Sequence, residues 1–425
     1  MSLRSRFPSP GALEQNTPLY RNSAAPRQSS ITVISSNQLQ AEAVARIEAI
    51  LESVLDAIHN RTDLVIPYRS IRSSSVSEKP EDGFVRFPGR TAQEAKRFEA
   101  LFRIIELSHE ALISGHLITK RNIYYQNVDL FKSQSVVDEM VDTLAYTLGL
   151  GRGDLNIVAA AKGLISGPID LIMRGGETIR CTQPADGLLL PMIQTIEKVD
   201  LYEAEWLLVI EKEATFRTLA AGRYHSMSAA GTGILITAKG FPDLATRRFL
   251  YALQSARPEL RMYALVDFDP HGIAILRTYR YGSKRLDHEI ESKVPSLRWL
   301  GIRSGDVLAR DRPESGQDGQ LPDSQSSQES VSFSQEESEG PRPYKRVRTQ
   351  EARDPDDSVL YLTENDRKKA IDLMTDICQY ELDNYALEQL QELQRMLMLG
   401  IKAEIQAVDD FGNLAKWLDK RLKPA

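Results

Sequence analysis

Apolar residues recur every three or four positions along several segments of the chain, and each such stripe predicts an amphipathic helix. The first helix is predicted within residues 31–60, and its stripe consists of Val44, Ile47, Leu51, Val54, Leu55 and Ile58. A second helix is predicted to begin after Thr91, because Thr91 and Glu94 have the spacing of a capping box ahead of an apolar stripe. A third begins near Ser135 and is expected to end at Gly149.

A short helical pattern in "GHLITKRNIYYQN" (residues 115–127) lies between the second and third of these helices. The strand-prone stretch "LNIVAAAKGLISG" (residues 155–167) follows the third helix. Three helices followed by short strands are typical of a helix-turn-helix module with a wing. Residues 85–190 are therefore predicted to form a winged-helix domain.

From Leu201 onward short apolar runs alternate with helical patterns. The runs "WLLVI", "GILIT" and "MYALVDFD" are almost continuously apolar, which is typical of strands in a parallel sheet covered on both faces. The fold class predicted for the whole chain is α/β plus α+β multidomain, with the winged-helix domain followed by an α/β domain over residues 200–425.

Two segments lack any hydrophobic periodicity. Residues 1–30 are rich in Ser, Pro and Arg, and residues 311–357 are rich in Ser, Gln, Glu and Pro and end in a basic cluster. Both compositions predict disorder. The first segment is thus expected to be a tail and the second an insert that interrupts the α/β domain. Because a Ser-rich stretch (residues 70–80) separates helix 31–60 from the next helix, helix 31–60 docks either on a partner chain or on its own chain, and the sequence leaves both possibilities open.

The chain has 425 residues, which is enough for two or three domains. No apolar run approaches the ~18 residues needed to cross a bilayer, and Cys181 and Cys378 are not part of a C-x-x-C pattern, so a membrane protein, a disulfide framework and a zinc site are all disfavoured. The formal charge is -6, but residues 311–340 hold 8 acidic residues and 1 basic one, and the remaining 52 basic and 51 acidic residues give a net charge of +1. Charge therefore neither favours nor excludes nucleic-acid binding.

Carboxylates follow two of the predicted buried strands directly. Glu211 comes after "WLLVI", and Asp267 and Asp269 end "MYALVDFD". The carboxyl ends of strands in open α/β sheets are where ligand sites form. Three carboxylates gathered there would repel one another unless they shared a cation, and Mg²⁺ prefers such oxygen ligands. Glu213 is a possible fourth acid, although its position favours a charge at the start of a helix.

Other catalytic motifs are absent or ambiguous in the sequence. His271 in "DPHG" is a candidate proton shuttle or a residue that caps a turn, and the second interpretation is favoured. The six histidines lack H-E-x-x-H spacing, and there is no G-x-x-x-x-G-K-[ST], so a zinc hydrolase and a P-loop ATPase are disfavoured.

The adjacent tyrosines Tyr124 and Tyr125 raise the question of covalent chemistry. A phenol, whose pKa is about 10, is a poor nucleophile at neutral pH unless cations stabilise the phenolate. Arg121 lies four residues before Tyr125, one helical turn away, and would face the same phosphate. From the residues alone, packing or a phosphate contact is the favoured interpretation of the pair.

Five segments in order, "KRNIYYQNVDLF", "VIEKEATF", "TAKGFPDLATRRFL", "LVDFDPHG" and "KAEIQAV", resemble the A subunit of type IIB DNA topoisomerase (topoisomerase VI) and, still more, its eukaryotic relative, the meiotic double-strand-break proteins of the sporulation-eleven family. The resemblance runs from about Thr91 to the C-terminus, apart from the insert. It implies a winged-helix domain that carries a nucleophilic tyrosine, followed by a Toprim domain that binds Mg²⁺.

The resemblance also implies roles for particular residues. Tyr125 matches the nucleophile and Tyr124 its neighbour near DNA, while Arg121 matches the arginine of the same motif. The metal-binding acids of the family correspond to Glu211, Asp267 and Asp269, and two further positions near DNA correspond to Lys162 and Phe241. One departure is visible, since Asn122 stands where the family usually has an acidic residue, and its amide can still accept a hydrogen bond.

The function implied is double-strand-break formation in meiotic recombination, by transesterification that leaves a 5'-phosphotyrosyl link. The expected partners are double-stranded DNA, a second copy of the chain on DNA, a topoisomerase VI B-like subunit bound through the N-terminal helix, and other proteins of the meiotic break machinery. The expected location is the nucleus and its chromosomes, and "PYKRVR" is a possible nuclear-import patch. The alternatives are the catalytic chain of a resealing type IIB topoisomerase, a catalytically silent DNA-binding scaffold, and a nuclease without a covalent intermediate.

Overall fold

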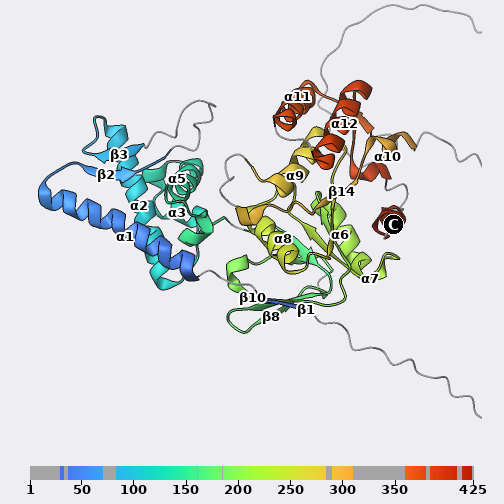
Figure 1. Ribbon diagram of the computed structural model, residues 1–425, viewed down its shortest axis with the longest axis horizontal. Coiled ribbons are helices and arrows are strands. Elements are labelled where there is room, and N and C mark those ends of the chain that lie inside the picture. Colours follow the sequence, from blue (N-terminus) through green and yellow to red (C-terminus); the bar gives the residue numbers. More distant parts are fainter. Residues whose placement is uncertain are drawn as a thin grey trace, which may run out of the picture.

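The computed structural model shows two lobes, which lie side by side in Figure 1. The structure describes residues 29–32, 37–69, 83–159, 161–183, 185–283, 290–309, 359–379, 383–408 and 414–423. Nearly all of the predicted tail (residues 1–30) and the predicted insert (residues 311–357) lie outside these ranges, as does "PYKRVR".

The first lobe, here called the helical lobe, comprises residues 37–159. Its elements in chain order are α1 (Asn37–Asn60), β2 (Leu64–Pro67), β3 (Phe84–Phe87), α2 (Ala92–Ser114), β4 (Ile118–Thr119), α3 (Lys120–Gln126), α4 (Val128–Phe131), α5 (Gln134–Thr147), η1 (Arg152–Leu155) and β5 (Ile157–Val158). One apolar core joins these helices. That this lobe is a winged-helix domain stays a prediction.

The second helix begins where the sequence predicts it. Thr91 Oγ1 accepts a hydrogen bond from the backbone N–H of Glu94 (3.2 Å), and a Glu94 carboxylate oxygen accepts one from the backbone N–H of Arg90 (2.6 Å). The helix ends at Gly115, whose φ of 70° is the left-handed conformation that glycine adopts without steric cost. The predicted third helix is α5, and it begins one residue earlier than expected.

Helix α1 packs on its own chain. Ala43, Ile47 and Val54 are buried in the core of the helical lobe, and α1 contacts both α2 and β2. Leu55 and Ile58 stay 64% and 57% exposed. The helix therefore docks on its own lobe with one face and keeps an apolar strip at its C-terminal end in contact with solvent.

The second lobe, here called the sheet lobe, is built on a six-stranded sheet. Its strand order is β14-β13-β11-β12-β6-β9, from β14 (Arg298–Gly301), β13 (Arg261–Leu265), β11 (Trp206–Ile210), β12 (Gly233–Thr237), β6 (Leu164–Ser166) and β9 (Leu188–Leu189). The first four strands are parallel. All residues of β11 and β12 are buried, as their apolar composition predicts, so the predicted α/β lobe with a largely parallel sheet is confirmed.

Helices cover the parallel strands and extend the lobe. They are α6 (Glu213–Ala221), α7 (Tyr224–Met227), α8 (Leu244–Ala256), α9 (Pro270–Tyr281), α10 (Ser304–Ala309), α11 (Glu364–Cys378), α12 (Asn384–Leu399) and α13 (Leu414–Leu422). In Figure 1, α11 and α12 lie together at one end of the lobe, beyond α9. The short strands β15 (Val359–Tyr361) and β16 (Ile401–Ala403) pair antiparallel, and Ala403 bridges to Phe268.

The order of the parallel strands creates a topological switch point. β11 is followed along the chain by β12 on one side, whereas β13, on the other side of β11, is followed by β14 further out. The loops that leave β11 and β13 therefore run in opposite directions, and open α/β sheets bind ligands in the crevice that such loops leave at the carboxyl ends of the strands.

The strands that follow the helical lobe pair differently from the expectation for residues 85–190. β6 joins the six-stranded sheet as the antiparallel neighbour of β12. β7 (Ile169–Met173) and β8 (Thr178–Arg180) lie in a separate four-stranded sheet with β10 (Ile196–Leu201) and β1 (Ser29–Thr32). Short apolar strands indicate that they pair but not with which strand, so the sequence placed residues 164–190 in the wrong unit. β1 also occupies the start of the segment predicted as helix 31–60, and the described helix of this segment, α1, begins at Asn37.

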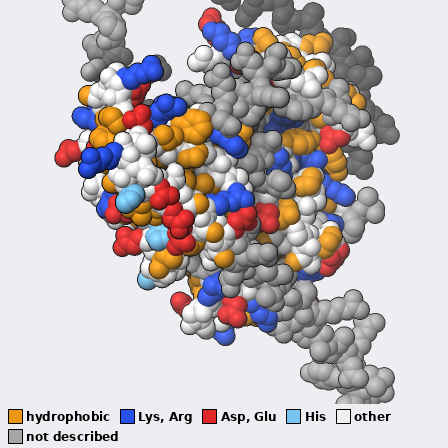
Figure 2. All heavy atoms as spheres, turned by 60° about the vertical axis from the view of Figure 1, so that its left-hand side comes forward, with side chains coloured by type: hydrophobic (Ala, Val, Ile, Leu, Met, Phe, Trp, Pro, Cys, Tyr) orange, Lys and Arg blue, Asp and Glu red, His pale blue; other side chains and the backbone are white. Residues whose placement is uncertain are grey.

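On the face that Figure 2 presents, the described surface is neither uniformly basic nor uniformly acidic. Lys and Arg side chains are interspersed there with acidic and apolar ones, in line with the near-neutral charge of the chain outside residues 311–340. None of the described helices is long and apolar enough to cross a membrane.

Candidate functional site

Two carboxylates meet at the switch point of the sheet. Glu211 is the first residue after β11, and its Oε2 accepts a hydrogen bond from the backbone N–H of Asp267 (2.9 Å), two residues beyond the end of β13. The backbone N–H of Glu211 in turn donates to Leu265 O (3.0 Å). Because β11 and β13 are adjacent parallel strands in register, the sheet itself brings the two acids together, as the sequence predicts.

Asp269 belongs to the same turn and caps a helix. Its Oδ1 accepts a hydrogen bond from the backbone N–H of Gly272 (2.5 Å) at the start of α9. A Cβ on Gly272 would lie 2.4 Å from Asp267 O, so only glycine allows α9 to start this close to the acidic turn. His271 is exposed on the first turn of α9. The capping that the sequence suggested for His271 is thus supplied by Asp269.

Lys212 is a further member of the acidic site that sequence reasoning missed. Its Nζ lies 3.0 Å from Asp267 Oδ2 and 3.1 Å from Glu404 Oε2, and it donates to Gln406 Oε1 (3.2 Å). The other carboxylate oxygen of Asp267, Oδ1, accepts a hydrogen bond from the backbone N–H of Ile405 (2.8 Å). The segment "KAEIQAV" therefore closes the site from a distant part of the chain. The available signal was the position of Lys212 between two acids in "EKE".

Burial perturbs both central acids, and at Glu211 the nearby charge of Asp267 adds to it. Burial first, and then the negative charge of Asp267, raise the pKa of Glu211 to about 8. Burial also raises the pKa of Asp267, against the opposing effect of the Lys212 ammonium. Glu213 behaves differently, because its hydrogen bonds to Arg217 and Lys239 lower its pKa. Glu213 is the first residue of α6, as the sequence favoured.

The acids have the oxygen ligands that a divalent cation prefers, but their side chains do not converge on one point. Within the described ranges, no three acidic, histidine or cysteine side chains converge as the ligands of a metal would. Mg²⁺ commonly uses one or two carboxylates together with water and substrate phosphate oxygens, and Glu211 and Asp267 provide two. Burial raises the pKa of both carboxyl groups, and a bound cation would offset the cost of keeping them ionised there. The residues thus fit a cation that arrives together with a phosphate.

The loop after β12 lies at the same edge of the sheet. The backbone N–H of Gly240 donates to Glu211 O (3.0 Å), and the next residue, Phe241, is 47% exposed. The backbone N–H of Lys162 donates to Asp243 Oδ2 (3.0 Å), and Asp243 also caps α8. The two predicted DNA-contact residues, Lys162 and Phe241, therefore lie at the same edge as the predicted metal-binding acids.

Tyr125 lies on α3 in the helical lobe and points into solvent. It is 67% exposed, and Arg121, one turn earlier on the same short helix, is exposed as well. Tyr124 is only partly exposed and packs against the core of the helical lobe. The two rings lie 5.4 Å apart at 51°. Packing is thus the role that the structure gives to Tyr124, whereas Tyr125 is free to reach a substrate.

The start of α3 does not depend on the side chain of Asn122. Thr119 Oγ1 accepts a hydrogen bond from the backbone N–H of Asn122 (3.0 Å), and the Asn122 side chain is exposed. The departure from the family pattern at this position therefore leaves the helix and its tyrosine in place.

A buried ion cluster anchors α3. Lys120, the first residue of the helix, is 3% exposed, and its Nζ donates to Asp142 Oδ1 (2.5 Å) and to Asp138 O (3.2 Å), both on α5. Arg152 Nη1 contacts the same Asp142 oxygen at 3.3 Å. Burial lowers the pKa of Lys120, and Arg152 lowers it further, whereas Asp142 raises it. The cluster fixes the helix that presents Arg121 and Tyr125.

The predicted residues thus form two groups. The acids, Lys162 and Phe241 share one edge of the sheet lobe, whereas Arg121, Tyr124 and Tyr125 share one short helix of the helical lobe. In Figure 1, α3 lies in one lobe and the strands that carry the acids lie in the other.

Comparison with known proteins matches both lobes to one family. Residues 206–346 match the model of the Toprim domain that the topoisomerase 6 A chain and Spo11 share, and residues 96–157 match "Type IIB DNA topoisomerase". Toprim domains are in general domains that bind divalent metals. The sheet lobe therefore contains a Toprim domain, and the pair of matches defines a protein related to the A chain of topoisomerase VI.

Curated relatives agree with these matches. The chain is 35% identical over 325 residues to meiotic recombination protein rec12 of Schizosaccharomyces pombe, which covers 76% of each chain. It is 34% identical to human meiotic recombination protein SPO11 over 52% of this chain and 56% of the relative, and 33% identical to the A chain of DNA topoisomerase 6 of Arabidopsis thaliana over 53% of this chain and 52% of the relative. The chain belongs to the Spo11 family of meiotic recombination proteins, relatives of the topoisomerase VI A chain.

Replacing Lys120 tests the anchoring of α3. We expect Lys120→Met to lower the free energy of unfolding by roughly 3–5 kcal/mol, because it leaves the Asp142 carboxylate buried without its closest partner. Lys96→Met, on the exposed face of α2, is the matched control and should change stability by less than about 0.5 kcal/mol. Urea unfolding of both variants and of Lys120→Met/Asp142→Leu measures the effect. Equal stability of Lys120→Met and Lys96→Met would show that the cluster does not hold the helix.

The acidic pair predicts a pH dependence of stability. The pKa of Glu211 is about 8 in the folded chain and ordinary when unfolded, so the folded state binds more protons between about pH 4.5 and 8. The metal-free protein should therefore lose stability as pH rises through this window. Glu211→Gln should flatten the decline, whereas Glu99→Gln, on the exposed surface of α2, should not. Urea midpoints between pH 5 and 8.5 in a chelator give the slopes, and identical slopes for Glu211→Gln and the parent would contradict the repulsion.

Proposed function

We propose that this protein forms DNA double-strand breaks that initiate meiotic recombination, and that it does so by a topoisomerase-like transesterification. The observation that carries the proposal is Tyr125, which is exposed one turn from the exposed Arg121 on a helix held by a buried ion cluster. The names of the relatives, meiotic recombination proteins rec12 and SPO11, support the biological setting.

In the proposed reaction the Tyr125 oxygen attacks a phosphorus atom of the DNA backbone. A bond forms between this oxygen and phosphorus, and the bond from phosphorus to the 3' oxygen breaks. The phenolic proton leaves Tyr125, and the departing 3' oxygen takes up a proton to become a hydroxyl. The product is a 5'-phosphotyrosyl link, and no water is consumed. Arg121 would hold the attacked phosphate through its guanidinium, which binds phosphate oxygens in a fork.

The acids of the Toprim domain would act on the same phosphate. A divalent cation, for which we propose Mg²⁺, would stabilise the negative charge that develops on the phosphate oxygens. Glu211 and Asp267 would hold it, with Asp269 beside them at the start of α9. Lys212 contacts Asp267 (3.0 Å) and orients its carboxylate. Lys162 and Phe241, at the same edge of the sheet, would contact the DNA next to the cleaved phosphate.

Two copies of the chain would bind one duplex, and each would cut one strand. Because Tyr125 and the acids lie in different lobes, we propose that the tyrosine of one copy meets the acids of the other. Cutting would then require the dimer on DNA. Contacts to the DNA backbone should dominate the affinity and make it strongly dependent on salt.

The catalytic chain of a resealing type IIB topoisomerase is a second candidate, which the similarity to the A chain of DNA topoisomerase 6 favours. It would use the same residues and differ only in the fate of the break. Relaxation of supercoiled DNA by the protein with a B-type partner would support this function over break formation.

The location and the other partners follow from the same proposal. A protein with this function works on chromosomes in the nucleus together with other proteins of the break machinery. The apolar strip that α1 leaves exposed, Leu55 and Ile58, is the surface that we propose for a B-like subunit.

The covalent step is tested with labelled duplex DNA. Protein, with and without a B-type partner, is incubated with the duplex and Mg²⁺ and then denatured, and label that stays with protein until protease is added measures the link. We expect Tyr125→Phe to lower this signal by about 10³-fold or more, because no other group supplies the nucleophile. Tyr124→Phe is the matched control and should retain the signal. Loss with Tyr124→Phe alone would instead make Tyr124 the nucleophile.

The same assay tests the acids. Asp267→Asn should abolish the covalent label and leave the protein folded. Retained covalent label with Asp267→Asn would refute the metal-binding role of Asp267, and free cleavage without attached protein would identify a nuclease.

A further inference from the structure

A cavity lies at the opposite edge of the sheet from the acids. Its volume is about 560 Å³, and Thr232, which directly precedes β12, lines it. Glu211 and Asp267 lie beyond the carboxyl ends of the strands, whereas Thr232 lies at an amino end. The cavity is therefore separate from the proposed cleavage site.

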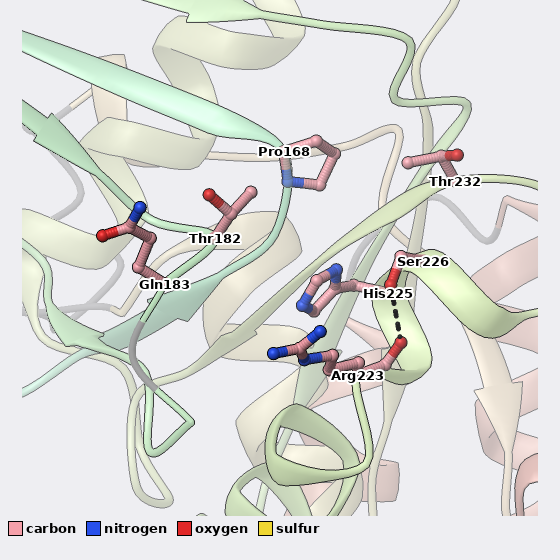
Figure 3. A pocket seen from close by; sticks show the side chains of 7 residues that line it. All are labelled: Pro168, Thr182, Gln183, Arg223, His225, Ser226 and Thr232. Atoms are coloured by element: carbon pink, nitrogen blue, oxygen red, sulfur yellow. Dashed lines mark hydrogen bonds between the residues drawn. The ribbon is translucent and has the colours of Figure 1, made fainter.

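The cavity is lined by groups that donate hydrogen bonds, from two directions. Figure 3 shows the side chains of Arg223 and His225 on one side, directed toward Thr182 and Gln183 on the other. None of the described residues that line the cavity is acidic. A guanidinium, an imidazole, hydroxyls and an amide without a carboxylate favour an anionic ligand.

Among these residues, His225 gives the strongest indication that the cavity holds a ligand. It is 5% exposed, and its Nδ1 is buried without a hydrogen-bond partner among the described residues. A buried polar atom without a partner costs about 1–3 kcal/mol. Such atoms are rare in folded proteins, and a bound ligand is one explanation for them. Burial, and then the neighbouring Arg223, lower the pKa of His225. Both effects favour the neutral imidazole, so His225 can offer a hydrogen bond to a ligand but adds no positive charge to the cavity.

The backbone holds Arg223 in place. Arg223 has a left-handed φ of 51°, a conformation that is uncommon for residues other than glycine and is found preferentially at functional sites. Its carbonyl accepts hydrogen bonds from the backbone N–H groups of Ser226 (2.9 Å) and Met227 (3.1 Å) and from Ser226 Oγ (3.1 Å), the last of which is the dashed line in Figure 3. The turn between α6 and α7 thus fixes the start of the Arg223 side chain at the cavity.

We propose that this cavity binds a small phosphate monoester of about the size of a nucleotide. The phosphate would lie between Arg223 on one wall and the Thr182 hydroxyl and Gln183 amide on the other, with His225 behind it. A phosphate offers acceptor oxygens in several directions, which matches donors on opposite walls, whereas a carboxylate would need only one forked partner. The volume lies within the roughly 300–1,000 Å³ of small-molecule sites and is far larger than a bare phosphate requires.

Thermal unfolding with adenosine monophosphate tests the site without any cleavage assay. A ligand that binds only the folded state raises Tm once its free concentration exceeds Kd, and the rise continues with the logarithm of the concentration. We expect adenosine monophosphate to raise Tm in this concentration-dependent manner, inorganic phosphate to do so only at higher concentrations, and adenosine to have no effect at matched ionic strength.

Arg223→Gln should weaken the effect of adenosine monophosphate roughly tenfold or more, as the loss of a charge-assisted pair predicts. Arg223 is exposed, so the ligand-free Tm of this variant should match that of the parent. Lys416→Gln, an exposed charge removal on α13, is the control and should keep the full effect.

Three results would overturn the proposal. One is no shift of Tm with adenosine monophosphate, or an equal shift in Arg223→Gln. The second is equal affinity for inorganic phosphate, which would show that only an anion is recognised. The third is competition between adenosine monophosphate and a fluorescent DNA duplex, with weaker duplex binding in Arg223→Gln, which would make the cavity a DNA-backbone contact. Loss of cleavage in Tyr125→Phe has no bearing on any of these results.

Discussion

The burial of two neighbouring carboxylates, Asp267 fully and Glu211 in part, is the constraint around which the sheet lobe is organised. Glu211 and Asp267 lie at the ends of adjacent parallel strands and share a hydrogen bond through a backbone N–H. The charge of Asp267 is compensated by Lys212 and by the backbone N–H of Ile405, which lies more than 130 residues away along the chain. Gly272 allows α9 to begin against the same turn. Burial still raises the pKa of both acids, so a cation that also binds a DNA phosphate would stabilise the ionised pair.

The proposed nucleophile, Tyr125, is held in the other lobe by a buried ion cluster. There a buried Lys–Asp–Arg cluster fixes a helix of only seven residues, so that a partly packed Tyr124 and an exposed Tyr125 are held in defined positions. Buried ion pairs contribute little net stability but are costly to break, which suits them to fix a helix too short to be stable alone. In the proposed enzyme the nucleophilic tyrosine and the metal-binding acids lie in different lobes. Neither lobe would therefore cut DNA by itself.

Local patterns predicted much of the site, and long-range pairing explains most of what they missed. Glu211 and Asp267 were predictable because a fully apolar strand followed by an acid places that acid at the sheet edge. The capping of α2 by Thr91 was predictable for the same local reason. The pairing of β6 with β12, the contact of Lys212 with Glu404 and the anchoring of Lys120 by Asp142 depend on which distant segments meet, which periodicity does not encode. The packing of α1 on its own lobe needed the structure as well, since its apolar stripe fits either surface.

The central claim is that each cleavage site combines Tyr125 of one copy with the acids of another, and mixing two inactive variants tests it most directly. Tyr125→Phe and Asp267→Asn are each assayed alone, and then mixed, with labelled duplex, Mg²⁺ and a B-type partner under conditions in which the unmodified protein forms covalent label. In a mixed dimer one site combines the intact tyrosine of the Asp267→Asn copy with the intact acids of the Tyr125→Phe copy. Covalent attachment should therefore return on one strand only. If each site were built within a single chain, every site in the mixture would lack one component. No covalent label from a mixture in which mixed dimers are demonstrated would contradict the claim.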